Sequence, residues 1–263
     1  MQSIQVADSI TKLGPQFRGT VLIAGSHGGR YCGYLAALSG LRGVIFNDAG
    51  VGKDNAGIGS LDYLQALGVA AATIAHTSAR IGDGDDMLDR GCISHCNETA
   101  RALGCSKDQP CREAAEILCS GSPFTDEVPR YEETRSVLQD EPIQIITCDS
   151  ASLVSPEDAG AFIITGSHGG VIAGRPGYGI AAQAKGAIFN DAGFGIDQAG
   201  IQRLETLEQA GIPAATVDAM TARIGDAMSA WETGILSHIN PQAKKHGVTV
   251  GMTVPEFAKK LSL

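Results

Sequence analysis

The sequence lacks long hydrophobic runs. No stretch reaches the roughly 18 apolar residues that are needed to cross a bilayer, and the first residues, MQSIQVADSITK, contain neither the basic nor the apolar region of a signal peptide. We therefore expect a cytoplasmic protein with no membrane partner. Basic residues are also fewer than acidic ones, with 20 Lys and Arg against 29 Asp and Glu. The net charge of -9 argues against nucleic acid as a partner, because an acidic surface repels phosphate backbones.

Two nucleotide-binding motifs and a disulfide pattern are missing as well. Without a P-loop or a G-x-G-x-x-G fingerprint, the chain gives no sign of NTP or NAD chemistry. The 7 cysteines are odd in number and the chain is not short, which argues against a disulfide framework. Cys92 and Cys96 flank His95, but Ile235 and Ile239 replace them where the chain repeats itself. This replacement favours buried apolar thiols over a metal site, and we predict no cofactor.

What the sequence does contain is an internal repeat. VLIAGSHGG (21–29) recurs as FIITGSHGG (162–170), and VIFNDAGVGKDNAGI (44–58) recurs as AIFNDAGFGIDQAGI (187–201). SARIGD (78–83) recurs as TARIGD (221–226), and GCISHCN (91–97) recurs as GILSHIN (234–240). Such self-similarity indicates a duplicated unit. We predict two repeats, 1–119 and 142–263, joined by the polar segment 120–141 as a linker.

Each copy alternates short apolar runs with amphipathic stretches. This alternation predicts βαβ units and a parallel sheet, and continuous apolar strands are typical of sheets with helices on both faces. We predict an α/β protein of two tandem, homologous, Rossmann-like repeats with mostly parallel sheets, related by a pseudo-twofold axis. A helix is expected after each Ser-His-Gly-Gly, and another over GCISHCN and GILSHIN.

Polar residues stand at the ends of the predicted strands in both copies. In open α/β sheets, ligands bind outside the carboxyl ends of the strands, so we expect these residues to converge in a pocket. They are Asp8-Ser9, Ser26-His27, Asn47-Asp48, Arg80 and Asp83 in the first copy, and Asp149-Ser150, Ser167-His168, Asn190-Asp191, Arg223 and Asp226 in the second.

Ser-His-Gly-Gly is the motif that we place at the centre of the site. A histidine between a serine and two glycines at a strand end is hard to explain as core packing, so we predict that His27 and His168 are catalytic acids or bases. The serine hydroxyls and glycine amides of both motifs are predicted to hold a developing oxyanion. They belong to Ser26, Gly28, Gly29, Ser167, Gly169 and Gly170. The alternative is a Gly-rich turn with a capping serine.

The Asn-Asp-Ala-Gly motifs are predicted to support the histidines. A carboxylate near an imidazole fixes its tautomer, so Asp48 and Asp191 are predicted to orient His27 and His168. Asn47 and Asn190 are predicted to bind substrate. The alternative is a turn in which these side chains bond local backbone N–H groups.

Arginines close the next strands. Arg80 and Arg223 are predicted to bind a substrate carboxylate bidentately, with structural Arg–Asp pairs as the alternative. Asp54 and Asp197 precede predicted helices and resemble N-caps.

One local pattern resembles a known family. An apolar strand that ends in Ser-His-Gly, followed by a second strand that ends in a small residue, resembles the His block of caspase-like cysteine peptidases. That family has a cysteine where FNDAG has Ala49 and Ala192, so the resemblance implies no peptidase activity here.

These motifs together predict an enzyme that acts on a small polar or anionic metabolite, as a hydrolase of an amide, ester or lactone. The first alternative is a metal-dependent hydrolase or lyase with a divalent ion between His27, Asp48 and either Asp83 or His95. The second alternative is a non-catalytic metabolite-binding or scaffold protein, which the similarity of the copies favours. Gly- and Ala-rich helix faces leave a homo-oligomer open.

Overall fold

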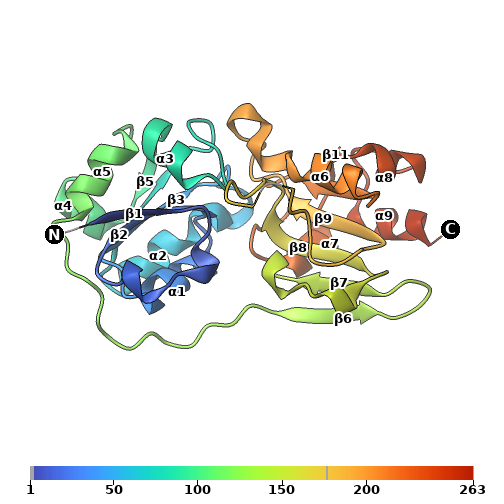
Figure 1. The fold of residues 1–263 in the computed structure, drawn as a ribbon, viewed down its shortest axis with the longest axis horizontal. Helices are drawn as coiled ribbons and strands as arrows, with labels where there is room; N and C mark the ends of the chain where they lie inside the picture. Colours follow the sequence, from blue (N-terminus) through green and yellow to red (C-terminus); the bar gives the residue numbers. More distant parts are fainter. Residues whose placement is uncertain (1–2, 176, 263) are drawn as a thin grey trace.

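The computed structural model describes residues 3–175 and 177–262, which form two similar halves lying side by side (Figure 1). Each half is a mainly parallel sheet with helices on both faces, so the predicted α/β fold class is confirmed. Within the described ranges, no helix is long and apolar enough to cross a membrane.

The first sheet has five strands in the order β1-β2-β3-β4-β5, of which only β5 is antiparallel to its neighbour. Consecutive parallel strands are neighbours, so right-handed crossovers place α1 and α2 on one face. Helices α3, α4 and α5 cover the other face. The strands are Ile4–Ala7 (β1), Val21–His27 (β2), Gly43–Asn47 (β3), Ala70–Ile74 (β4) and Ile93–Cys96 (β5). The helices are Arg30–Leu38 (α1), Gly59–Ala66 (α2), Gly84–Arg90 (α3), Glu98–Leu103 (α4) and Cys111–Leu118 (α5).

The second sheet has six strands in the order β11-β10-β9-β8-β7-β6. Strands β7 to β10 are parallel, and antiparallel strands form both edges. The strands are Arg135–Gln139 (β6), Ile145–Cys148 (β7), Phe162–His168 (β8), Gly186–Asn190 (β9), Ala214–Val217 (β10) and Leu236–Ile239 (β11). The helices are Arg203–Gln209 (α6), Ala227–Thr233 (α7), Pro241–Lys245 (α8) and Val254–Leu261 (α9).

The apolar runs of the sequence build these sheets because side chains alternate between the two faces of a strand. On β2, Leu22 and Ala24 pack toward α1 and α2, whereas Val21 and Ile23 pack toward α3 and α5. All four side chains are fully buried. A strand covered on both faces needs apolar residues at every position, which is why the run is continuous.

Three predicted helices are absent from the described residues. The segment after the second Ser-His-Gly-Gly, residues 171–185, holds no helix in its described part, whereas the first motif is followed by α1. The segment has glycines at 174, 177 and 179, and each glycine disfavours a helix by about 1 kcal/mol relative to alanine.

GCISHCN and GILSHIN do not form helices either; they form the edge strands β5 and β11. Gly91 and Gly234 end α3 and α7, so the helix stops before the Ser-His pair begins.

The predicted linker also contributes to the fold. Residues Arg135–Gln139 form β6 and pair with β7 at the edge of the second sheet. Residues 120–134, which we call the strap, run along one side of the molecule from the first half to the second (Figure 1).

The halves meet through the loops that follow β3 and β9. A Cβ added to Gly50 would lie 2.8 Å from the Cα of Gly193, and one added to Gly193 would lie 2.7 Å from the Cα of Gly50. The two loops therefore touch backbone to backbone at matching positions, which is the contact expected on a pseudo-twofold axis.

Hydrogen bonds across this junction repeat in the same way. The N–H of Lys53 donates to the Ala219 carbonyl at 2.8 Å, and the N–H of Ile196 donates to the His76 carbonyl at 2.9 Å. A small apolar cluster drawn from both halves lies beside them. Its buried members are Ala49, Ile81, Ala192, Ala199 and Ile224.

Candidate functional site

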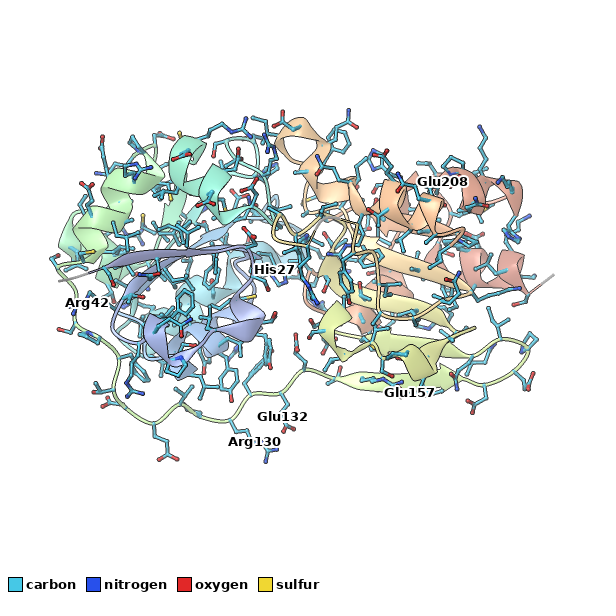
Figure 2. All side chains as sticks on the ribbon, viewed as in Figure 1. His27, Arg42, Arg130, Glu132, Glu157 and Glu208 are labelled. Carbon is cyan, nitrogen blue, oxygen red and sulfur yellow. The ribbon has the colours of Figure 1, made fainter. Side chains whose placement is uncertain are left out.

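A cavity of about 820 Å³ lies between the halves, where the carboxyl ends of the two sheets face each other. Both halves and the strap line it, and Figure 2 shows His27 at the junction of the halves. Several residues of the predicted site come together in this wall: Ser26, His27, Gly29, Ser167, His168 and Arg223.

His27 faces the cavity as a neutral hydrogen-bond donor. The backbone N–H of Gly29 donates to its Nδ1 at 3.1 Å, so the single proton of the neutral ring sits on Nε2. Burial lowers the pKa of His27 to about 4, which keeps the ring neutral at physiological pH. The ring can therefore donate from Nε2, but it has no free lone pair with which to act as a base.

His168 repeats this arrangement in the second half. The N–H of Gly170 donates to its Nδ1 at 3.1 Å. Burial lowers the pKa of His168 well below its usual value, and the charge of Arg203 lowers it further.

Each histidine packs against the Arg-Ile-Gly-Asp loop of the opposite half. A Cβ on Gly225 would lie 3.5 Å from the Cε1 of His27, and a Cβ on Gly82 would lie 3.5 Å from the Cε1 of His168. The site therefore combines the histidine of one half with the loop of the other.

The predicted oxyanion hole of serines and amides is not formed. Within the described chain, the Gly28 and Gly169 amides donate to the carbonyls of Asn47 and Asn190, and the next amides bond the imidazoles. The serine hydroxyls accept hydrogen bonds from a neighbouring loop: Ser26 accepts from the Ile10 N–H at 3.0 Å, and Ser167 accepts from the Ala151 N–H at 2.9 Å. Within the Ser-His-Gly-Gly motifs, the groups left to donate are the imidazole Nε2–H and the serine O–H.

The Asn-Asp motifs build the loops rather than the cavity wall. The Asn47 amide donates to the Ala79 carbonyl and accepts from the Ala49 N–H, and Asn190 makes the matching bonds. Neither asparagine lines the cavity. The prediction that they bind substrate is therefore not supported, since their side chains hold the turn.

The aspartates of these motifs do not orient the predicted histidines. Among the described residues, the hydrogen bonds of Asp48 go to the Gly50 N–H and to His76, whose Nδ1 lies 2.8 Å from the Asp48 Oδ1. Asp191 accepts from the N–H groups of Gly193 and Ala219. An aspartate at a strand end can bond any polar group nearby, and the loop that packs over the strand end determines which group that is.

The two arginines link the halves. Arg80 Nε lies 3.0 Å from Asp197, and Arg223 Nη1 lies 3.0 Å from Asp54. Asp54 and Asp197 are not N-caps; both have a positive φ, of 55°, inside a distorted turn. Of the two arginines, only Arg223 lines the cavity, and it is already paired.

The metal-binding alternative finds no assembled ligand set. Among residues 3–175 and 177–262, no group of three or more His, Cys, Asp or Glu is placed to hold an ion. Asp48 bonds His76, Asp83 caps α3, and His95 lies on edge strand β5 beside Ser94. A divalent metal remains an untested prediction.

The strap supplies two cavity residues that the sequence did not single out, Tyr131 and Glu133. It is fixed at Thr134, whose N–H and hydroxyl both donate to Asp149 at 2.7 Å. Burial, helped by the negative charge of Asp149, raises the pKa of Glu133 to about 7. Glu133 can thus give and take a proton near neutral pH.

Aromatic residues gather at the same side of the cavity. Ring centroids of Tyr31, Tyr34 and Tyr63 lie 5.9, 6.1 and 6.5 Å from that of Tyr131. The guanidinium of Arg30 lies 5.8 Å from the Tyr131 ring. Four of the 5 tyrosines therefore cluster here, and Tyr31 and Tyr131 of this cluster line the cavity. Flat rings beside a cation suit a small organic ligand.

Arg203 is a third wall residue that the sequence analysis missed. It is only 2% exposed and lines the cavity. It shares a helix face with Leu207 and Ala210, so an arginine within an apolar stripe was the available signal.

The two halves contribute different segments to the cavity wall. The irregular segment after the second Ser-His-Gly-Gly contacts the first half: the Ala173 N–H donates to the Gly82 carbonyl at 2.9 Å, and the Gly174 N–H donates to Asp8 at 2.8 Å. Ile172 and Arg175 of this segment line the cavity, whereas residues 30–32 of α1 do so in the first half. The cavity is therefore asymmetric although the halves are similar. Comparisons of the chain with protein-family models, curated proteins and solved structures found no match.

Proposed function

We propose that the protein is an enzyme that hydrolyses an amide, ester or lactone bond of a small anionic metabolite bound between its halves. One observation carries this proposal. A neutral imidazole that can only donate, His27, and a carboxyl group with a pKa near 7, Glu133, line the same cavity. An oxyanion donor and a base matched to neutral pH are the two groups that such a hydrolysis needs.

In the proposed reaction, ionised Glu133 takes a proton from water as the water oxygen adds to the substrate carbonyl carbon. The carbonyl oxygen becomes an oxyanion and accepts a hydrogen bond from His27 Nε2–H. Collapse of this intermediate breaks the bond to the leaving nitrogen or oxygen, which receives the proton from Glu133. The bound His27 proton is not transferred, in keeping with its neutral state.

A direct attack by water fits the other wall groups. The Ser26 hydroxyl accepts a hydrogen bond from the Ile10 N–H and has no histidine or carboxylate partner among the described residues. Burial raises the pKa of the Cys32 thiol, so this cavity residue is not a ready thiolate nucleophile.

The test is hydrolysis of a panel of carboxylate- and phosphate-bearing amides, esters and lactones, followed by proton NMR. We expect His27→Gln and Glu133→Gln each to lower kcat/KM by about 100-fold or more. Because Glu133 must be ionised to act, the wild-type rate should rise through pH 7 and then level off, and Glu133→Gln should remove this rise.

Glu132→Gln is the matched control. Glu132 is the next residue of the strap, is exposed, and points away from the ribbon beside Arg130 (Figure 2). It should leave both the rate and the pH profile unchanged. Binding of a panel compound without turnover would instead favour a metabolite-binding protein, and equal rates for His27→Gln and wild type would refute the proposal.

A further inference from the structure

Arg203 is a buried positive charge with no acidic partner among the described residues. Its Nε and Nη2 donate to the Gly170 carbonyl at 3.2 and 2.9 Å, and its Nη1 donates to the Gly179 carbonyl at 3.4 Å. A guanidinium has five N–H groups, so one on each terminal nitrogen is left without an acceptor in the described chain. Burial lowers the pKa of Arg203 to about 10, and it stays charged at neutral pH.

The fold itself does not require this charge. Ser60 holds the matching position of the first half, where its N–H donates to the Gly28 carbonyl at 2.8 Å, just as the Arg203 N–H donates to the Gly169 carbonyl at 2.8 Å. The first half packs α2 with a serine at this point. The buried guanidinium of the second half is therefore an addition to the shared fold. Carbonyl hydrogen bonds and the Phe189 ring, 4.8 Å from its Cζ, compensate part of its desolvation, but none of these groups carries a negative charge.

Two further donors of the second half, Arg175 and His168, line the same cavity as Arg203. Arg175 lines the cavity with its guanidinium 4.7 Å from the Tyr178 ring, and it forms no ion pair within the described residues. Arg223, by contrast, is paired with Asp54 and Asp226. His168 adds a neutral donor, because its Nδ1 is occupied by the Gly170 N–H.

We infer that Arg203, Arg175 and His168 form an oxyanion subsite that anchors the carboxylate or phosphate group of the ligand. A bound oxyanion would accept from the two remaining N–H groups of Arg203 in a bidentate pair and would neutralise its charge. The identity of this ligand as the substrate rests on the proposed function. The second half would then hold the substrate, while His27 and Glu133 act on its other end.

The experiment measures binding without turnover. The thermal midpoint of the full-length protein is followed against increasing acetate or inorganic phosphate at constant ionic strength, with chloride as the reference. We expect one of the two anions to raise the midpoint saturably, which also identifies the preferred group. Arg203→Ser introduces the residue that the first half has at the matching position, and the apparent Kd for the anion should rise at least 10-fold in this variant.

Two further variants complete the design. Arg175→Gln changes an exposed position and should raise the apparent Kd for the anion at least 3-fold. This variant tests the subsite even if Arg203→Ser fails to fold. Arg112→Ser removes an exposed arginine of α5 that pairs with Asp89, and it should leave the apparent Kd unchanged. No saturable shift over chloride, or the same Kd in wild type and Arg175→Gln, would overturn the subsite. Intact anion binding together with unaffected turnover in His27→Gln would overturn only the proposed function.

Discussion

Asp48 and Asp191 stand at matching positions and yet have opposite pKa shifts. Burial acts to raise both pKa values. At Asp48, hydrogen bonds from the side chain and backbone of His76 outweigh burial and lower the pKa. At Asp191, Ala219 replaces the histidine and supplies only its N–H, so the pKa stays raised. The difference between His76 and Ala219 thus determines whether the ionised carboxylate stabilises or destabilises the folded state.

We therefore predict that Asp48→Asn lowers the free energy of unfolding at pH 7 by about 1–3 kcal/mol, the cost of disturbing a buried charged hydrogen bond. Asp191→Asn should lower the free energy of unfolding by much less or raise it, because burial disfavours the charged form of the wild-type carboxylate. Urea denaturation of both variants beside wild type measures the difference, and equal losses would contradict the argument.

The pH dependence has opposite signs at the two positions. The stabilisation from Asp48 is present above the unfolded pKa of about 3.9 and is lost as the pH falls through its lowered folded pKa. That from Asp191 is complete below about 3.9 and is lost as the pH rises through its raised folded pKa. The deficit of Asp48→Asn should therefore shrink only under acid conditions.

Single residues were the hardest to predict from the sequence. The position of His27 and His168 in one cavity follows from their place at the ends of β2 and β8, and Arg223 reaches it from the loop between β10 and α7. The bonding of Asp48 to His76 does not, because His76 lies in a later loop whose path depends on tertiary packing. Glu133 lies outside the repeat, where a polar segment offers no pattern that separates a cavity residue from a solvated one.

At the scale of elements, the two loops at the junction hold an unusual backbone. Non-glycine residues with positive φ recur at matching positions of both loops, where the left-handed region is disfavoured for side chains. They are Ala49, Val51, Asp54 and Asn55 in the first loop and Ala192, Phe194, Asp197 and Gln198 in the second. Contacts between the loops must offset this strain, so each loop depends on the other half for its shape.

Gly50→Ala tests that dependence. Gly50 has a φ of +75°, and an added Cβ would lie 2.8 Å from the Gly193 backbone. Gly68→Ala is the control, because Gly68 has a φ of +69° and no atom within 4 Å of an added Cβ. Both variants carry the left-handed penalty of about 1–2 kcal/mol. Gly50→Ala should cost roughly 1–3 kcal/mol more from overpacking, measured as free energy of unfolding in urea; equal costs would show that the loops can move apart.

The alternation of strands and helices was predictable because burial on both faces demands continuous apolar runs. The missing helix at 171–185 and the strands at GCISHCN and GILSHIN were not. After the second Ser-His-Gly-Gly the repeat suggested a helix like α1, whereas the glycine content disfavours one. At GCISHCN and GILSHIN the spacing of Gly, Ser and His suggested a helix, whereas both copies form edge strands. Short segments at sheet edges carry too few residues for a clear period.

At the scale of the molecule, the ion pairs between the halves contribute little. The arginine side chains of the Arg80–Asp197 and Arg223–Asp54 pairs are 39% and 40% exposed, and pairs of this kind are worth about 0–1 kcal/mol. The interlocked loops and the apolar cluster around Ala49 and Ala192 hold the halves instead. Such contacts join the two cores into one cooperative unit.

We therefore expect one unfolding transition, and the chain offers a separate probe for each half. The single Trp, Trp231, packs against the core of the second half, and the tyrosine cluster around Tyr131 belongs to the first half and the strap. Tryptophan fluorescence and tyrosine absorbance should give the same urea midpoint. Two separated midpoints would show that the halves unfold independently.

The proposed catalytic base, Glu133, lies on the strap between the two repeated segments. Glu133 belongs to neither copy of the repeated sequence, whereas the histidines, the loops and the arginine pairs come from the copies themselves. Two unconnected copies could assemble nearly the whole cavity and still lack Glu133. Under the proposed function, the connector supplies the reactive carboxylate, and joining the copies into one chain is what turns a binding cleft into a catalyst.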